Sequence, residues 1–336
     1  MDPYDVTIVG GGPVGLFSAA MAGMHGLRAK IIESLPQLGG QLRALYPEKR
    51  VFDVAGFASA TAADLAERLK EQAMAYGPAV HLGETVLALE VLARGGFLLG
   101  TTGGSHLSRS VLIAAGLGAF SPRLLPAEGA ERLQGRGVYY SAPSPATFQG
   151  QTVVVVGGGD TAVDWAREIA GHAARVVLVH RREQFRAHQG NLGEVRALGN
   201  VELRTPCEVV AVAGQSAVSA VRLRNLASGG EEEVAAQAVV SGLGFHAQLA
   251  ALKEWGIAFH GNAIAVDPST MQTNLPGVYA VGDIAAYPGR LKLLALGFGE
   301  AGLAVARIRS YVHPELSGSL PHSSALETLA GRTAVG

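Results

Sequence analysis

The sequence has a single cysteine, Cys207, among its 336 residues. No intrachain disulfide, no Cys-x-x-Cys redox pair and no cysteine-ligated zinc or iron–sulfur centre can therefore form within one chain. Any redox chemistry would have to come from a bound cofactor, and no metal site is predicted. Because Cys207 follows a proline in a β-like stretch, we expect an inert, buried thiol.

Charge is also scarce and nearly balanced. Charged residues make up 16% of the chain, and 27 basic residues against 28 acidic ones leave a formal net charge of −1. No run of like charges exceeds three residues, so the sequence does not have the strong basic field that nucleic-acid binding usually needs. With 48% hydrophobic residues, 45 Gly and 15 Pro, the composition is typical of a globular α/β protein, and the length favours two domains.

One uncharged run is long enough to resemble a membrane span. Residues 6–27 carry no formal charge. Six glycines and Pro13 interrupt this run, and Asp2 and Asp5 stand where a signal peptide would carry positive charge. We therefore expect no membrane segment and a cytoplasmic protein.

Two segments of the chain begin in nearly the same way. Residues 6–9 lead into a glycine-rich run, as do residues 153–156, and an Ala-rich helical pattern follows each run. In such an opening the first glycine permits a tight turn, the second lets the backbone approach a pyrophosphate, and the third small residue lets helix and strand pack. The predicted binding residues are Gly10, Gly12, Pro13 and Gly15 in the first copy, and Gly157, Gly159, Asp160, Thr161 and Ala162 in the second.

The residue that ends the next predicted strand distinguishes the two copies. In both copies it lies 23 positions after the first glycine. In the first copy it is Glu33, whose carboxylate would accept hydrogen bonds from ribose hydroxyls and repel a 2′-phosphate, as suits FAD. In the second it is His180, followed by Arg181 and Arg182, whose guanidiniums would bind the 2′-phosphate of NADP(H). Arg186 is a candidate for a further phosphate contact, and the alternative for the whole group is a solvated basic strand end.

A third nucleotide signal lies near the C-terminus. A turn at residues 273–277 precedes a predicted strand at residues 278–281, which ends at Gly282 and Asp283. Asp283 could accept hydrogen bonds from the ribitol hydroxyls of a flavin. A helix predicted from about residue 294 to 312 would direct the positive end of its dipole at that flavin.

Taken together, these segments resemble the thioredoxin-reductase-like flavoproteins. A thioredoxin reductase would carry a Cys-x-x-Cys near the start of its second nucleotide domain, whereas residues 140–148 contain no cysteine. Thioredoxin reductase activity is therefore excluded. The resemblance implies an α/β fold with two Rossmann-like dinucleotide-binding domains.

A longer series of motifs resembles the type 2 ferredoxin–NADP reductases of bacteria and spans nearly the whole chain. It comprises residues 39–42, 45–49, 53–57, 282–284, 287–289, 292–293, 297–301 and 321–324. The resemblance implies a discontinuous FAD domain at residues 1–117 and 245–336, which includes a C-terminal extension, and an NADP(H) domain at residues 118–244.

The same resemblance implies further contacts with FAD. These would be made by Gln41, Val86, Phe120 and Asp283, in addition to Gly12, Gly15 and Glu33. Tyr46 would stack on one face of the isoalloxazine ring. His322, contributed across a homodimer, would cover the other face, and Ser324 would touch the flavin.

The resulting hypothesis is a homodimeric, FAD-dependent ferredoxin–NADP reductase. Hydride would pass between NADP(H) and flavin N5, and single electrons would pass to or from ferredoxin or flavodoxin. No side chain is predicted to act as nucleophile or general base. An acidic ferredoxin would need a local basic face, for which the candidates are Arg43, Lys49, Arg50, Arg290 and Lys292. The alternatives are a flavin enzyme that reduces a small acceptor, such as a quinone or free flavin, and a non-enzymatic sensor that binds FAD and NADP(H).

Overall fold

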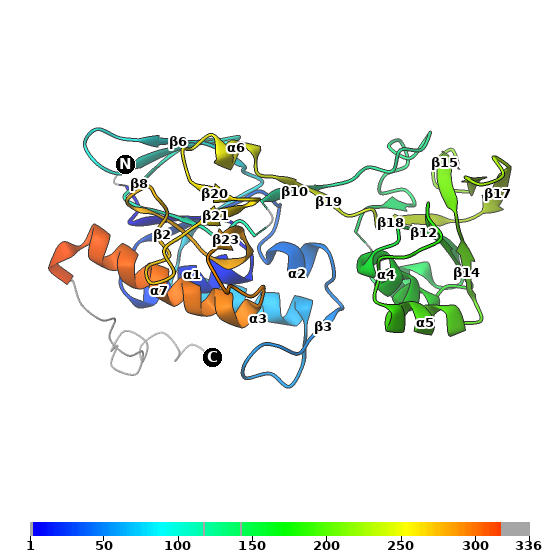
Figure 1. Ribbon diagram of the computed structural model, residues 1–336, viewed down its shortest axis with the longest axis horizontal. Coiled ribbons are helices and arrows are strands. Elements are labelled where there is room, and N and C mark those ends of the chain that lie inside the picture. The colour runs from blue at the N-terminus through cyan, green and yellow to red at the C-terminus, as the bar shows by residue number, and fades with distance from the viewer. Residues whose placement is uncertain (1–2, 117, 142, 317–336) are drawn as a thin grey trace. The chain divides into compact units, whose positions relative to one another are not determined.

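The computed structural model describes residues 3–116, 118–141 and 143–316 (Figure 1). The chain divides into two units, one of residues 1–120 and 247–336 and the other of residues 121–246. Two strands, β10 (Ala119–Pro122) and β19 (Phe245–Gln248), pair with each other where the chain passes between the units. Across the described ranges, no helix is both long enough and apolar enough to cross a membrane.

A five-stranded parallel sheet forms the centre of the first unit. Its order is β22-β9-β1-β2-β5, and every neighbouring pair is parallel. The central strand β1 is buried at all four positions, which agrees with its uninterrupted β-branched sequence. The strands are β1 (Val6–Val9), β2 (Ala29–Glu33), β5 (Ala79–Leu82), β9 (Val111–Ile113) and β22 (Val278–Ala280).

Helices cover one face of this sheet. The core between sheet and helices includes Ile8, Leu16, Leu69 and Ile308. The uncharged run at residues 6–27 thus forms β1 and the first of these helices, and the predicted C-terminal helix begins and ends where expected. The helices are α1 (Pro13–Met24), α3 (Ala62–Met74) and α7 (Leu294–Val312), with the short α2 (Gly40–Ala44) beside them.

The other face packs against a layer of short strands, most of them antiparallel, and one short helix. Phe97, Leu99 and Trp255 fill this second core, together with Ile32 from the parallel sheet. The elements of this layer are β6 (Val86–Val91), β7 (Phe97–Thr101), β8 (Gly104–Ser108), α6 (Ala250–Lys253), β20 (Phe259–His260), β21 (Ala263–Ala265) and β23 (Ala285–Ala286). The remaining elements are the hairpin β3 (Arg50–Val51) and β4 (Ala60–Thr61) and the 3-10 helices η2 (Gly282–Ile284) and η3 (Pro314–Leu316).

The second unit repeats the plan of the first. Its parallel sheet has the order β11-β18-β12-β13-β14, with helices α4 and α5 on one face and the antiparallel strands β15, β16 and β17 on the other. The parallel strands are β11 (Val138–Tyr139), β12 (Thr152–Val156), β13 (Arg175–Val179), β14 (Val201–Arg204) and β18 (Ala238–Ser241). The other elements are η1 (Pro145–Phe148), α4 (Asp160–Ala170), α5 (Gln189–Ala197), β15 (Cys207–Ala213), β16 (Ala220–Asn225) and β17 (Glu231–Ala235).

The strand register shows how closely the units correspond. Val6 of β1 lies opposite Ala29 of β2, and Thr152 of β12 lies opposite Arg175 of β13, so the same number of residues separates the partners in both pairs. The two parallel sheets confirm the predicted pair of βαβ openings. Cys207 is buried at the start of β15, as predicted, and its burial raises the pKa of the thiol.

Candidate cofactor sites

The glycine-rich turn after β1 is shaped by close backbone approaches. Gly10 has a φ of +108°, and a Cβ there would lie 2.6 Å from the carbonyl oxygen of Ala114. A Cβ on Gly15 would lie 2.0 Å from the Gly10 oxygen, so neither position tolerates a side chain. At Gly12, by contrast, the nearest heavy atom to a Cβ would be 3.9 Å away. The turn is therefore closed beneath Gly10 and open at Gly12, where a ligand can approach.

Helix α1 begins at this open position. Gly12 is its N-cap and Pro13 occupies its first turn, where a proline sacrifices no hydrogen bond. No acidic residue stands in that first turn. No carboxylate within that turn therefore offsets the positive end of the helix dipole or binds the N–H groups there. This arrangement suits a pyrophosphate.

A cavity of about 650 Å³ in the first unit extends from this helix end. Its volume is in the range of roughly 300–1,000 Å³ that is usual for ligand sites. It is lined by eight of the residues predicted to contact FAD, namely Gly10, Gly12, Pro13, Glu33, Gln41, Tyr46, Val86 and Asp283. Gly15 packs against Gly10 instead, and Phe120 lies in β10. His322 and Ser324 are outside the described residues.

Glu33, the last residue of β2, is held at the cavity wall by the glycine-rich turn that follows β1. The buried carboxylate accepts a hydrogen bond from the Gly11 amide at 2.6 Å through Oε2 and one from the Leu35 amide at 2.9 Å through Oε1. These bonds orient the group and leave lone pairs that can accept from ribose hydroxyls. A Cβ on Gly11 would lie 3.3 Å from the Glu33 side chain, so a bulkier residue would crowd the carboxylate.

Tyr46, Gln41 and Asp283 stand together on the cavity lining. The Tyr46 hydroxyl donates to Gln41 Oε1 at 3.2 Å. Burial raises the pKa of Tyr46, and the nearby Asp283 carboxylate raises it further, so the phenol stays protonated at neutral pH. This part of the lining thus carries an aromatic face and polar groups, which match a flavin ring and its ribitol chain.

Behind Asp283 lies a buried network that the sequence did not indicate. Glu300 of α7 accepts hydrogen bonds from the Gly282 amide at 2.7 Å, the Tyr287 hydroxyl at 2.8 Å and Arg290 Nε at 2.8 Å. Burial and the bond to Glu300 raise the pKa of Tyr287 to about 12. The network fixes the backbone next to Asp283. A lone glutamate inside an otherwise apolar helix segment is the one signal that could have pointed to it.

The inclusion of Arg290 in a basic surface was wrong. Its side chain is only 5% exposed, and it is paired with Glu300 and lies 3.6 Å from Asp283. Sequence position alone placed it near the flavin with the other basic residues. Its charge is compensated inside the unit, so it contributes little to the field outside.

The second unit has the same glycine-rich turn, here after β12, but different residues beside it. A Cβ on Gly157 would lie 2.6 Å from the Gly242 oxygen and 2.7 Å from Ala162, whereas Gly159, the N-cap of α4, has no heavy atom within 4 Å. Thr161 lies in the first turn of α4. As in the first unit, the turn is closed where the sheet packs and open at the start of the helix.

The basic segment after β13 folds back onto this turn. The Arg186 amide donates to the Gly158 oxygen at 2.7 Å, and the His188 amide donates to Asp160 Oδ1 at 2.8 Å. These two bonds hold the segment beside the start of α4. Arg181, Arg182 and Arg186 are exposed there, and none of them has an ion-pair partner in the part of the chain that the structure describes.

His180 behaves differently from the arginines that follow it. Its ring is buried beneath Gly158, where a Cβ would lie 2.3 Å from the imidazole, and packs at 4.9 Å from the ring of Phe185. Burial lowers the pKa of His180, so the ring is neutral at pH 7. The exposed positive charge beside this turn therefore comes from the arginines.

The chain is similar over most of its length to proteins of known type. Residues 4–305 match the family model described as pyridine nucleotide-disulphide oxidoreductase. It is 44% identical to a ferredoxin–NADP reductase of Geobacillus kaustophilus over 96% of this chain and 97% of that one. It is 45% identical to a ferredoxin–NADP reductase of Thermus thermophilus, with the same shares covered.

Solved structures agree on the fold. A Lactococcus lactis thioredoxin reductase superimposes with a TM-score of 0.74 at 24% identity, and covers 93% of this chain and 100% of its own. The T. acidophilum thioredoxin reductase gives the same TM-score at 25% identity, with 92% and 99% covered. The predicted thioredoxin-reductase-like architecture is confirmed.

Proposed function

We infer the function from this premise: the chain belongs to the pyridine nucleotide-disulphide oxidoreductase family and, within it, to the ferredoxin–NADP reductases. It is an oxidoreductase that uses FAD and NADP(H) and exchanges electrons with ferredoxin. The observation that carries this inference is the contrast between two repeated units. At the same strand end, one unit presents the Glu33 carboxylate and the other presents the guanidiniums of Arg181 and Arg182.

The residues of the first unit fit FAD. Gly12 and the start of α1 would bind the pyrophosphate, Glu33 the adenosine ribose, and Asp283 the ribitol chain, while Tyr46 would cover one face of the ring. When bound, FAD supplies hydride exchange with NADP(H) at flavin N5 and single-electron exchange with ferredoxin. The chain's own contribution is to bind, orient and shield; no side chain has to transfer a proton.

The residues of the second unit fit NADP(H). Gly159 and the start of α4 would bind the pyrophosphate, and Arg181, Arg182 and Arg186 would bind the 2′-phosphate through charge-assisted hydrogen bonds. We accordingly assign residues 1–117 and 245–336 to FAD binding and residues 118–244 to NADP(H) binding. Flavodoxin as a second acceptor, and a homodimer in which His322 and Ser324 complete the partner's flavin site, stay predictions of the family resemblance.

An anaerobic titration tests this assignment. NADPH should bleach the visible absorbance of the bound flavin at much lower concentration than NADH, because only NADPH offers a 2′-phosphate to the arginines. Oxidised ferredoxin should then restore the absorbance. A flavin that NADPH leaves oxidised would support the sensor instead, and a reduced flavin that reacts with quinone or free flavin but not with ferredoxin would support the small-acceptor enzyme.

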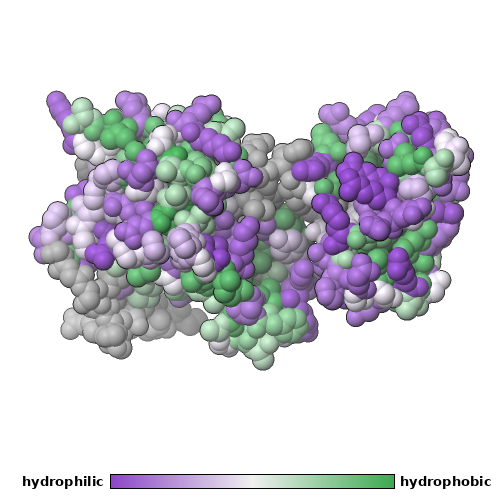
Figure 2. All heavy atoms as spheres, in the orientation of Figure 1, coloured by the Kyte–Doolittle hydropathy of each residue, from purple (hydrophilic) through white to green (hydrophobic). Residues whose placement is uncertain are grey.

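We place the ferredoxin contact beside the mouth of the cavity. The β3–β4 loop exposes Phe52 at 70%. At the place where Figure 1 draws this loop, Figure 2 shows green, hydrophobic atoms on the surface. Lys49 and Arg50 are exposed just before this loop, Arg50 as the first residue of β3, and Lys292 is both exposed and part of the cavity lining. The charge of Arg43 is balanced by Glu67, which lies 2.5 Å from it, so Arg43 is left out of this surface. Apolar side chains rimmed by positive charge suit an acidic partner that docks transiently.

Charge reversal in this loop should therefore slow electron transfer. Arg50→Glu is expected to lower the rate of ferredoxin reduction roughly tenfold at low ionic strength, through lost steering, with a smaller effect at high salt. NADPH-dependent reduction of ferricyanide should be unchanged. Arg94→Glu, at an exposed turn between β6 and β7, is the matched control. Equal rates for the two variants at every salt concentration would rule out this docking surface.

A further inference from the structure

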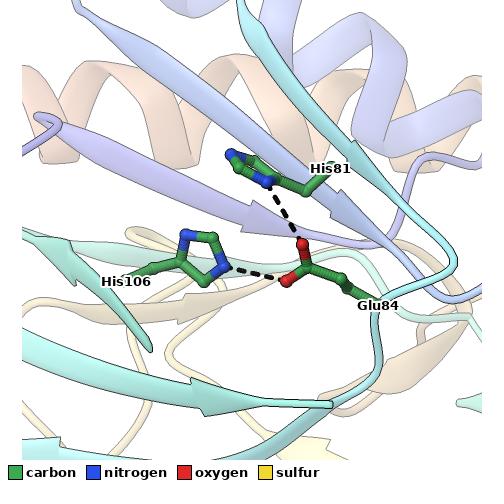
Figure 3. A group of neighbouring side chains, drawn as sticks. All are labelled: His81, Glu84 and His106. Carbon is green, nitrogen blue, oxygen red and sulfur yellow. Dashed lines mark hydrogen bonds and ion pairs between the residues drawn. The ribbon is translucent and has the colours of Figure 1, made fainter. Parts of the chain in front are cut away.

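Three side chains of the first unit converge beside the cavity, two from neighbouring positions in the chain and one from a more distant strand (Figure 3). His81 is on β5, Glu84 is in the turn that follows, and His106 is on β8. His81 Nδ1 lies 3.2 Å from Glu84 Oε1, and His106 Nε2 lies 2.9 Å from Glu84 Oε2. Both imidazole rings point toward the carboxylate, and the three donor atoms lie within 4.8 Å of one another.

The group is held in place from outside. The Thr101 hydroxyl donates a hydrogen bond to Glu84 Oε2 at 2.7 Å. The backbone amide of Glu84 donates one to the backbone carbonyl oxygen of Glu33 at 3.0 Å. The bond from Thr101 and that from His106 lower the pKa of Glu84, so the carboxylate is ionised at neutral pH. The His106 and Glu84 side chains are only 11% and 17% exposed, whereas His81 is 37% exposed. The two imidazoles are thus positioned by strands and the carboxylate by the turn after β5, with access from solvent beside His81.

We propose that His81, Glu84 and His106 form a binding site for a divalent transition metal ion, with Zn²⁺ as the representative ion. Two imidazole nitrogens and one carboxylate oxygen make up a donor set that zinc takes when a fourth position is left for water. Zinc bonds of about 2.0–2.1 Å at a tetrahedral angle separate neighbouring donors by roughly 3.3 Å. Each imidazole nitrogen lies at a comparable distance from one oxygen of the Glu84 carboxylate, His81 Nδ1 at 3.2 Å from Oε1 and His106 Nε2 at 2.9 Å from Oε2. Two nitrogen donors favour zinc, nickel or copper over magnesium and calcium.

The sequence concealed this site because its parts are not adjacent in the chain. His81 and Glu84 are three residues apart but do not share a helix. His106 joins them only through the fold, which brings its ring to 4.5 Å from the ring of His81. None of the three ligands is a cysteine. The scarcity of cysteine, on which the prediction of no metal site was based, therefore does not bear on this site.

Lys30 offers a specific way to examine the site. It is buried on β2, and its Nζ lies 3.3 Å from His106 Nδ1, the ring nitrogen that faces away from Glu84. An ammonium at this place repels a dication and competes for the same imidazole. Removing it should therefore tighten metal binding, an effect opposite to that of removing a ligand.

The test is a Zn²⁺ titration of the purified, chelator-treated full-length protein with its flavin bound. Isothermal calorimetry, together with metal analysis after dialysis, should give one zinc ion per chain. His81→Gln should weaken binding at least about tenfold, since loss of a supporting group alone typically costs that much. Lys30→Met should tighten it at least about fivefold. His260→Gln, an exposed histidine elsewhere in the same unit, should change nothing.

Thermal unfolding gives a second readout that does not depend on activity. Zinc should raise the Tm of the parent protein, because an ion that binds only the folded state stabilises it, and at the same zinc concentration it should raise the Tm of His81→Gln by less. The zinc-free Tm of each variant shows whether it folds, and Glu84→Gln provides a second ligand variant. Equal zinc affinity in the parent protein and both ligand variants would overturn the proposal, as would the absence of any stoichiometric zinc. Neither result bears on flavin reduction by NADPH, so the two proposals fail separately.

Discussion

Replacement of Arg181 and Arg182 by Ala is expected to raise the KM for NADPH by about 10²- to 10⁴-fold. Each charge-assisted hydrogen bond to a phosphate contributes about 1.5–3 kcal/mol, and the exposed guanidiniums beside the start of α4 are free of ion pairs within the described ranges. The KM for NADH should change little, because NADH has no 2′-phosphate. Steady-state kinetics with each nucleotide and a small electron acceptor gives both KM values, and their ratio in the variant and in the parent protein measures the effect directly.

The control for this prediction comes from the same strand. Arg175 begins β13, is exposed, and pairs with Glu202 at the edge of the sheet away from the glycine-rich turn. Arg175→Ala should leave both KM values as they are. If the double variant loses NADPH and NADH binding equally, the arginines support the fold of the turn. If it loses neither, they are a solvated strand end.

The second large effect concerns stability. Glu300→Gln is expected to lower the free energy of unfolding by about 3–5 kcal/mol, because the 5%-exposed Arg290 would remain as a buried charge without its main carboxylate partner. In a chain of this size that corresponds to a fall in Tm of roughly 4–7 °C. The Gly282 amide would also lose its anionic acceptor, so we expect weaker retention of FAD beside Asp283.

A double variant separates the charge effect from simple loss of packing. Glu300→Gln combined with Arg290→Met should recover much of the lost stability, since the buried charge is removed together with its partner. Glu202→Gln, at an exposed ion pair, should cost no more than about 1 kcal/mol. Thermal unfolding followed by circular dichroism measures all three. A double variant no more stable than Glu300→Gln would contradict the buried-charge explanation.

Much of the fold follows from short stretches of sequence. The β-branched residues of β1 and β12, the glycines after them and the helices that follow recur at the same spacing, and the register of the strands matches it. The limits of α7 also agree with the sequence pattern. These features depend on contacts between residues close in the chain or on the alternation within one strand, so a linear pattern is sufficient to determine them.

The sequence pattern located only some of the site residues correctly. Glu33 could be located because a fixed strand–turn–helix unit places its strand end beside the glycine-rich turn. The same reasoning treated His180, Arg181 and Arg182 as one group, whereas the structure buries the first under Gly158 and exposes the other two. Which side of a turn each residue faces depends on what packs against it.

The sequence by itself thus determined the two glycine-rich strand–turn–helix openings and the family, and it predicted that one opening prefers a ribose and the other its 2′-phosphate. Only the tertiary structure decided that Arg290 is buried against Glu300 and that His81, Glu84 and His106 meet. The physical reason is the same in each case. A charge or a ligand is defined by its neighbours in space, and these neighbours come from elements that only packing brings together.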